Sequence, residues 1–168
     1  MANGEKQVDP GFGLDMSEGG VRLAMCGRAL SAATVMFHTA VADRMGLSVT
    51  DHKCLDLARR AEGPVTAGRI AELSGLSTGA VTGVIDRLER ARFVRRVRDP
   101  HDRRKVLVEV LAKDAGEHAW MFQGLRDACE KAVQQHSAGE IEVIISYLTE
   151  MTETLHAETK RVRDHDNG

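Results

Sequence analysis

The sequence has few aromatic residues, few cysteines and almost no net charge, and each shortage narrows what the protein can be. Four Phe, one Trp and one Tyr among 168 residues mean that the hydrophobic core is mainly aliphatic. The three cysteines, Cys26, Cys54 and Cys129, are odd in number and widely spaced, so they indicate neither a disulfide framework nor a zinc motif. Reduced thiols in a cytoplasmic protein are the simplest interpretation. The net charge of −2 argues against a protein that binds polyanions through overall charge.

Long apolar runs and catalytic motifs are also missing. No run approaches the roughly 20 apolar residues that span a membrane, and the N-terminus lacks the basic start and apolar stretch of a secretory signal. The chain has no glycine-rich phosphate loop, no nucleophile elbow and no carboxylate pair in a recognisable frame. Its seven histidines form no i, i+4 pair and no Cys–His cluster. We therefore expect a cytoplasmic protein that is not an enzyme, with no cofactor, no metal site and no membrane partner.

The charge that is present is unevenly distributed along the chain. Residues 67–105 contain ten basic and five acidic residues, a net charge of +5, so the remaining residues carry −7. A basic module inside an acidic scaffold is typical of a protein that binds nucleic acid with one part of its surface.

Helix start and stop signals divide the chain into a series of helices. Thr50, Thr66 and Ser77 are each suited to cap the start of a helix, and Ser137 with Glu140 forms a capping box. The expected helices cover about residues 21–45, 50–61, 66–74, 77–91, 112–135 and 137–160. The polar, glycine-rich residues 1–16 are expected to form a flexible arm, and residues 161–168 a flexible tail.

A basic hairpin follows the fourth expected helix. Val106, Val108 and Val110 alternate with other residues as in a half-buried strand, so 93–98 and 105–110 are predicted strands around a turn at 99–104. A short helix, a turn, an amphipathic helix and a basic hairpin, in this order, indicate a winged helix-turn-helix.

The fold class is therefore mainly α with a small β-wing. We expect the winged helix-turn-helix domain at residues 49–110, between dimerisation helices at 17–48 and 111–160. The dimerisation role is inferred because the long amphipathic end helices have few local partners. In the fourth helix, one face is apolar and a second, polar face is left to meet a ligand. The apolar face consists of Val81, Val84, Ile85 and Leu88, and the polar face of Thr78, Thr82, Asp86 and Arg90.

At this point the chain resembles the multiple-antibiotic-resistance regulator (MarR) family, which are bacterial winged-helix transcription factors. The most specific part of the resemblance is LSTGAVTGVIDRLE at residues 76–89, followed by RRVRDPHDRR at 95–104. The resemblance implies a homodimer with interlocked terminal helices that binds a pseudo-palindromic site on double-stranded DNA. It also implies a repressor of transcription that a small molecule releases from DNA.

The resemblance also points to individual DNA-binding residues. At the start of the fourth helix these are Ser77, Thr78 and Gly79, with Thr82 one turn later against a base and Arg87 against a phosphate. In the hairpin loop, Arg104 is expected in the minor groove, Asp102 as the group that holds it, and Arg103 on a phosphate. Many family members have Arg where this chain has Gly83. The preferred DNA sequence therefore cannot be copied from relatives.

An effector site and a redox site are further hypotheses. In relatives, the effector pocket lies beside the DNA module, where His38 and His52 can approach one another. Together with Arg44 and Trp120, these histidines are the candidate ligand-binding residues, and surface or linker-facing histidines are the alternative. Some relatives sense peroxides through a Cys near the start of the first helix, which makes Cys26 a candidate, although no activating base flanks it.

Other functions of the same fold remain open from sequence. One is a non-catalytic ligand-binding or protein-interaction module that has lost DNA specificity, for which Gly83 leaves room. Another is a thiol-based redox-sensing regulator. The sequence does not separate a repressor from an activator.

Overall fold

The computed structural model describes residues 6–8, 13, 15–102, 105–111 and 118–165, and the chain divides into a unit ending at His118 and a second unit from Ala119 onward. The first unit begins with the antiparallel strands β1 (Lys6–Val8) and β2 (Asp15–Ser17). The sequence predicted a flexible arm over residues 1–16. The described part of this segment instead pairs Lys6 with Ser17 and Val8 with Asp15.

Three N-terminal helices follow, each started by a side-chain cap. The long helix α1 (Glu18–Arg44) begins at Ser17, whose Oγ accepts a hydrogen bond from the N–H of Gly20 at 3.2 Å. Helix α2 (Val49–Arg59) begins at Ser48 rather than at the predicted Thr50, because the Ser48 Oγ accepts from the N–H of Asp51. After β3 (Val65–Thr66), Thr66 caps α3 (Ala67–Ser74) as predicted.

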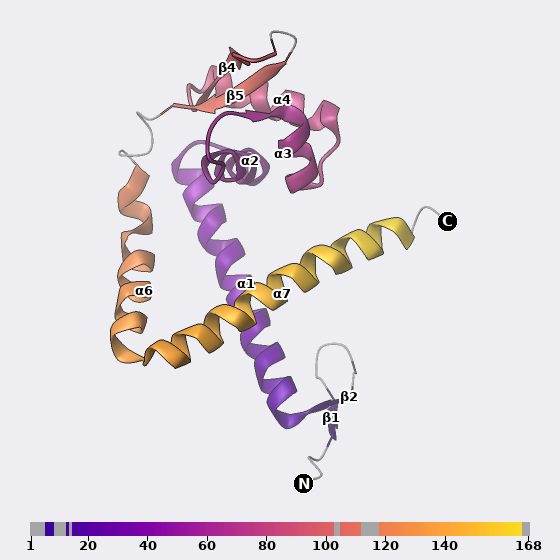
Figure 1. The fold of residues 1–168 in the computed structure, drawn as a ribbon, viewed down its shortest axis with the longest axis vertical. Helices are drawn as coiled ribbons and strands as arrows, with labels where there is room; N and C mark the ends of the chain where they lie inside the picture. The colour runs from indigo at the N-terminus through magenta and orange to yellow at the C-terminus, as the bar shows by residue number, and fades with distance from the viewer. Residues whose placement is uncertain (1–5, 9–12, 14, 103–104, 112–117, 166–168) are drawn as a thin grey trace. The chain divides into compact units, whose positions relative to one another are not determined.

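The helix-turn-helix and its hairpin complete the first unit. Helix α4 (Thr78–Arg90) is followed by β4 (Val94–Arg98) and β5 (Val106–Val110), which pair with Val94 opposite Val110. Strand β3 pairs with the other edge of β5, so the sheet order is β3-β5-β4 and β4 is an edge strand. Figure 1 shows α2, α3 and α4 gathered beside this sheet. This arrangement confirms the predicted mainly helical fold with a small β-wing.

The core of the first unit lies between α2, α3, α4 and the sheet. The predicted apolar face of α4 is buried, since Val81, Val84, Ile85 and Leu88 are each at most 2% exposed. Fully burying one such side chain stabilises the fold by roughly 1.5–3 kcal/mol. Because this face is committed to the core, the orientation of α4 is fixed and its polar face points to solvent.

The second unit consists of η1 (Ala119–Phe122), α6 (Gln123–Gln135) and α7 (Ala138–His165). The helix predicted from about residue 112 is described only from His118, as one short 3-10 turn and then α6. Residues 161–165, predicted as part of a flexible tail, continue α7 instead. The apolar side chains of α7 are largely exposed within this single chain; they include Val143, Ile144, Ile145, Leu148, Met151 and Leu155.

Among the described residues, no helix combines the length and the apolar character needed to cross a membrane. The described residues also contain no group of three or more His, Cys, Asp or Glu side chains positioned to hold a metal ion.

Candidate nucleic-acid interface

The start of α4 exposes the predicted polar residues to solvent. The Oγ of Ser77 accepts a hydrogen bond from the N–H of Ala80 at 3.2 Å, so this side chain caps the helix. Thr78 and Gly79 are exposed in the first turn, and nothing lies within 4 Å of the position that a Cβ would take at Gly79. The backbone N–H groups of this turn and the helix dipole favour an approaching phosphate.

One turn further along, Thr82 is held in a defined orientation. Its Oγ1 donates a hydrogen bond to the carbonyl oxygen of Thr78 at 3.0 Å. Because the hydroxyl proton is used within the helix, the group has only lone pairs and a methyl left for a ligand. Such a side chain can accept from the amino group of adenine or cytosine, or contact the methyl of thymine. Asp86 and Arg90 are exposed on the same face, as predicted.

Arg87, which was expected to contact a phosphate, is bonded to Asp51 in the structure. Its Nε lies 2.9 Å from Asp51 Oδ2 and its Nη2 lies 2.6 Å from Asp51 Oδ1, which makes a bidentate pair between α4 and α2. Asp51 is 5% exposed, whereas the Arg87 side chain is 48% exposed. Burial alone raises the pKa of the Asp51 carboxyl, but hydrogen bonds from Arg87 and Ser48 outweigh it and leave the pKa below its usual range. Only the remaining part of the guanidinium, near Nη1, is left for DNA.

Gly83 leaves space beside that remaining nitrogen. A Cβ at Gly83 would lie 3.6 Å from Arg87 Nη1, which is an ordinary contact distance. Gly83 therefore leaves the surface next to Arg87 open.

Two arginines of β4, Arg95 and Arg96, are also paired within the module. Arg95 Nε bonds the carboxylate of Glu109 across the β4–β5 pair. The guanidinium of Arg96 bonds Asp86 and Glu89 of α4. Together with Arg69, Arg87 and Lys105, at least five of the ten basic residues in the segment 67–105 are ion-paired. Fewer than the ten cations of this segment are therefore without a carboxylate partner that would compete with a phosphate.

The described part of the wing turn is ordered by one carboxylate. Asp99 Oδ1 accepts hydrogen bonds from the N–H groups of His101 at 2.7 Å and Asp102 at 3.2 Å. The bond from His101 is the main reason that the pKa of Asp99 lies below its usual range. Asp102 forms an ion pair with Lys105 at 3.7 Å. Arg103 and Arg104 lie outside the described residues, so the predicted contact between Asp102 and Arg104 stays a prediction.

The two histidines of the predicted effector site do approach one another. The ring centroids of His38 on α1 and His52 on α2 are 5.4 Å apart. His52 is 3% exposed. Burial and the neighbouring His38 both lower the pKa of His52, and Arg59 and Lys53 lower it further against the opposing effect of Asp56.

The other two candidate ligand residues are exposed. Arg44 lies at the end of α1, and Trp120, in the second unit, is 63% exposed. The structure brings together the two histidines, which lie on neighbouring helices. The role of all four residues in binding an effector stays a prediction.

Among the three cysteines, burial raises the pKa of the Cys54 thiol, which makes it less reactive. Cys26 and Cys129 are exposed, as a redox sensor requires, but exposure alone does not activate a thiol.

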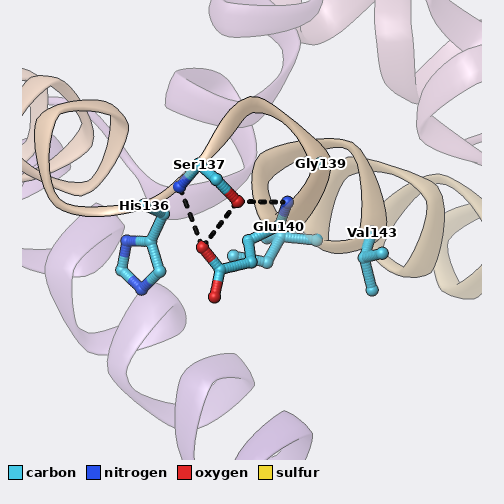
Figure 2. Close-up of a pocket in the computed structure, with 6 residues that line it drawn as sticks. His136, Ser137, Gly139, Glu140 and Val143 are labelled. Carbon is cyan, nitrogen blue, oxygen red and sulfur yellow. Dashed lines mark hydrogen bonds between the residues drawn. The ribbon is translucent and has the colours of Figure 1, made fainter.

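A hollow at the start of α7 carries no chemistry of its own. Figure 2 shows Ser137 and Glu140 bonded to each other there, with Val143 beside them. The N–H of Ser137 donates to Glu140 Oε2 at 2.8 Å, and the N–H of Glu140 donates to Ser137 Oγ at 3.3 Å. This is the capping box predicted from sequence, and its polar groups are used to start the helix.

Comparison with known proteins agrees with this geometry. The family model described as the MarR family matches residues 47–106. The uncharacterized HTH-type transcriptional regulator YcgE of Bacillus subtilis is 36% identical over 136 residues, which cover 81% of this chain and 88% of that protein. A MarR family protein from Bacillus stearothermophilus has a similar fold, with a TM-score of 0.62 and 22% identity over 84% of this chain and 99% of that one. Streptococcus pneumoniae FabT, solved in complex with DNA, has a TM-score of 0.59 and 22% identity over 80% and 97%.

Proposed function

Because the chain belongs to the MarR family of transcriptional regulators, we propose that it is a ligand-responsive repressor that binds a pseudo-palindromic operator as a homodimer. The observation that carries the proposal is the division of α4 into two faces. Its apolar face is fixed in the core, and Thr78, Thr82 and the first-turn N–H groups face solvent. This is the geometry of a helix that enters a major groove.

Few side chains of the protein would recognise the DNA sequence. Thr82, with its proton donated to Thr78, would select bases that offer a donor or a methyl group. Thr78 and Gly79 would meet the DNA backbone at the helix start, and Ser77 would keep these N–H groups in place. Arg87 would add a contact only through the nitrogen that Asp51 does not hold.

The wing would contribute the minor-groove contact. We assign this to Arg104, with Arg103 on a phosphate, on the strength of the family resemblance in the DPHDRR turn. A narrow minor groove rich in A·T pairs attracts a guanidinium because its negative potential is enhanced. The turn residues Asp99 and Asp102 would support the loop from its base.

Dimerisation would cover apolar surface that a single chain leaves exposed. On α1, Leu23, Met25, Leu30 and Met36 are each at least half exposed, and α7 exposes a further apolar stripe. Contiguous exposed apolar surface of this kind marks an interaction site. A homodimer would bury it and set the two α4 helices about one helical turn of DNA apart.

An effector would act by favouring a dimer with a different spacing of these helices. The His38–His52 pair is the described feature that we propose for this site, with Arg44 and Trp120 as weaker candidates. We place the protein in the cytoplasm, where a bacterial chromosome lies, and we expect no enzymatic activity.

The proposal can be tested by selecting duplexes from a random pool on the immobilised protein and titrating them by fluorescence anisotropy. We expect binding at least about 10³-fold tighter than to a scrambled duplex at the same salt concentration. Thr82→Ala should relax the preference at one symmetric position per half-site, while Thr82→Ser, which keeps the hydroxyl, should relax it less. Equal affinity for all duplexes would contradict the proposal and favour a protein-interaction module.

A further inference from the structure

One arginine ties the wing to the recognition helix. Arg96 lies in the middle of β4, and its guanidinium reaches α4, where Nη2 is 2.6 Å from Asp86 Oδ1 and Nη1 bonds Glu89 Oε2. The second oxygen of Glu89 accepts the backbone N–H of Arg96 at 2.8 Å. A side chain and a backbone group of the wing are therefore both held by the same helix.

The hydrogen bond from the Arg96 N–H to Glu89 takes the place of a bond that a neighbouring strand would accept. Strand β4 is at the edge of the sheet, so its outward N–H groups have no neighbouring strand to bond. Glu89 supplies the acceptor for one of them. The bonds from the Arg96 backbone and side chain together hold the pKa of Glu89 below its usual range, so the carboxylate stays charged at neutral pH.

The charges of the cluster make Arg96 unsuited to phosphate. One guanidinium faces two carboxylates, so Asp86, Glu89 and Arg96 carry a net charge of −1. The Arg96 side chain is only 32% exposed. A phosphate approaching it would meet a negatively charged cluster whose positive group is already bonded.

The position of the cluster means that a small rotation at Arg96 displaces the turn at the end of the hairpin. Asp99 follows Arg96 by three residues, about 10 Å along an extended strand. A rotation of the hairpin of several degrees at this point would move the tip by about 1 Å, which is enough to weaken a hydrogen bond. Fixing the middle of β4 therefore limits how far the turn that follows it can move relative to α4.

We propose that Arg96 is a positioning residue for DNA recognition, which holds the wing at a fixed angle to α4 so that major-groove and minor-groove contacts form together. This inference rests on the proposed DNA-binding function, because the angle matters only to a protein that uses both elements. Asp86 and Glu89 are the residues of α4 that accept the hydrogen bonds of Arg96.

The first test uses the free protein and needs no DNA. Hydrogen exchange of the backbone amides of β4 should be faster in Arg96→Ala than in wild type. Arg95→Ala is the matched control, because it removes the same charge from the same strand and breaks only the pair with Glu109. Equal exchange rates in wild type and Arg96→Ala would show that Arg96 does not hold β4 against α4, whether or not the protein binds DNA.

The second test uses two duplexes selected by the protein that differ only in A·T or G·C pairs at the flanking minor groove. Wild type should prefer the A·T flank, and Arg96→Ala should lose at least about fivefold of that preference while Arg95→Ala keeps it. The slope of log K against log salt should stay within about 0.3 of wild type. Because the homodimer carries two copies of Arg96, a fall in the slope of about 1.8 would identify Arg96 as a phosphate contact and overturn the proposal.

Glu89→Gln distinguishes an electrostatic effect on DNA binding from a positioning effect, because the two change the affinity in opposite directions. Removing a negative charge near DNA should tighten binding if electrostatic attraction alone decides the affinity. If Glu89 positions the wing through Arg96, the variant should instead bind the A·T-flanked duplex more weakly and lose flank preference. Tighter binding with the flank preference intact would contradict the positioning role. If wild type prefers no duplex, the proposed function is refuted. The hydrogen-exchange result would still show whether Arg96 holds β4 against α4.

Discussion

The end of α4 contains a strained residue whose replacement should stabilise the protein. Arg92 has φ of 63°, the left-handed region, and it is the one non-glycine residue with positive φ among the described residues. Its N–H donates to Glu89 O at 3.0 Å, and the N–H of Phe93 donates to Leu88 O at 2.9 Å, which closes the helix. Glycine normally occupies such a position. After α1 and α3, Gly46 and Gly75 do so with φ of 66° and 70°.

The size of the effect follows from two opposing contributions. A side chain in the left-handed region costs roughly 1–2 kcal/mol. Glycine removes that cost but gains freedom in the unfolded chain, which offsets about 0.5–1 kcal/mol. The Arg92 side chain is exposed and makes no ion pair or side-chain hydrogen bond within the described part of the chain. Arg92→Gly should therefore raise the free energy of unfolding by about 0.5–1 kcal/mol, or the melting temperature by about 1–4 °C.

The assay is urea unfolding followed by circular dichroism, at one protein concentration because dimerisation contributes to stability. Arg92→Ala is the control, since it removes the guanidinium but keeps the Cβ and hence the strain. It should show no gain. An equal gain in both variants would mean that the charge, not the backbone, destabilises this position. A loss in Arg92→Gly would refute the strain argument.

Three further predictions concern the ion pair, the buried histidine and the wing. Asp51→Asn should lower the free energy of unfolding at pH 7, measured by urea titration. Because the depressed carboxyl pKa confers stability only while the group is charged, the difference from wild type should shrink as pH falls below about 4. A difference that stays constant with pH would contradict the ion pair. The lowered pKa of His52 means that the unfolded chain binds its proton more readily, so thermal stability should fall as pH drops below about 6.5. His52→Gln should flatten that fall, and an unchanged pH profile would assign it to another group. Arg104→Ala should weaken operator binding by at least about tenfold with no change in melting temperature, and unaltered affinity would remove the wing from the mechanism.

The sequence predicted those parts of the fold that depend on neighbouring residues. Ser77 and Thr66 were recognisable as caps because a hydroxyl three residues before a free N–H is a local signal. The apolar face of α4 was recognisable because its period follows the helical repeat. The displaced start of α2 shows the limit of local signals, since Ser48 and Thr50 are both suitable caps and packing selects between them.

The contacts that define the candidate site depend on residues far apart in the sequence. Asp51 and Arg87 are separated by 36 positions, and no local pattern marks either as the partner of the other. The tie from Arg96 to Glu89 likewise requires the strand to fold back along α4. For this reason the family resemblance could assign Arg87 to a phosphate without revealing its pair with Asp51. The sequence also had no signal for β3, a strand of two residues.

Sequence-specific DNA binding can be measured by selecting fragmented genomic DNA of the source organism on the purified protein and sequencing the retained fragments. We expect enrichment of a pseudo-palindrome whose half-sites lie about one helical turn apart. The enrichment should disappear when Thr82→Ala and Arg104→Ala are combined. Retention of all fragments without a shared motif, lost uniformly as salt rises, would show that binding is nonspecific and that the protein is not a sequence-specific regulator.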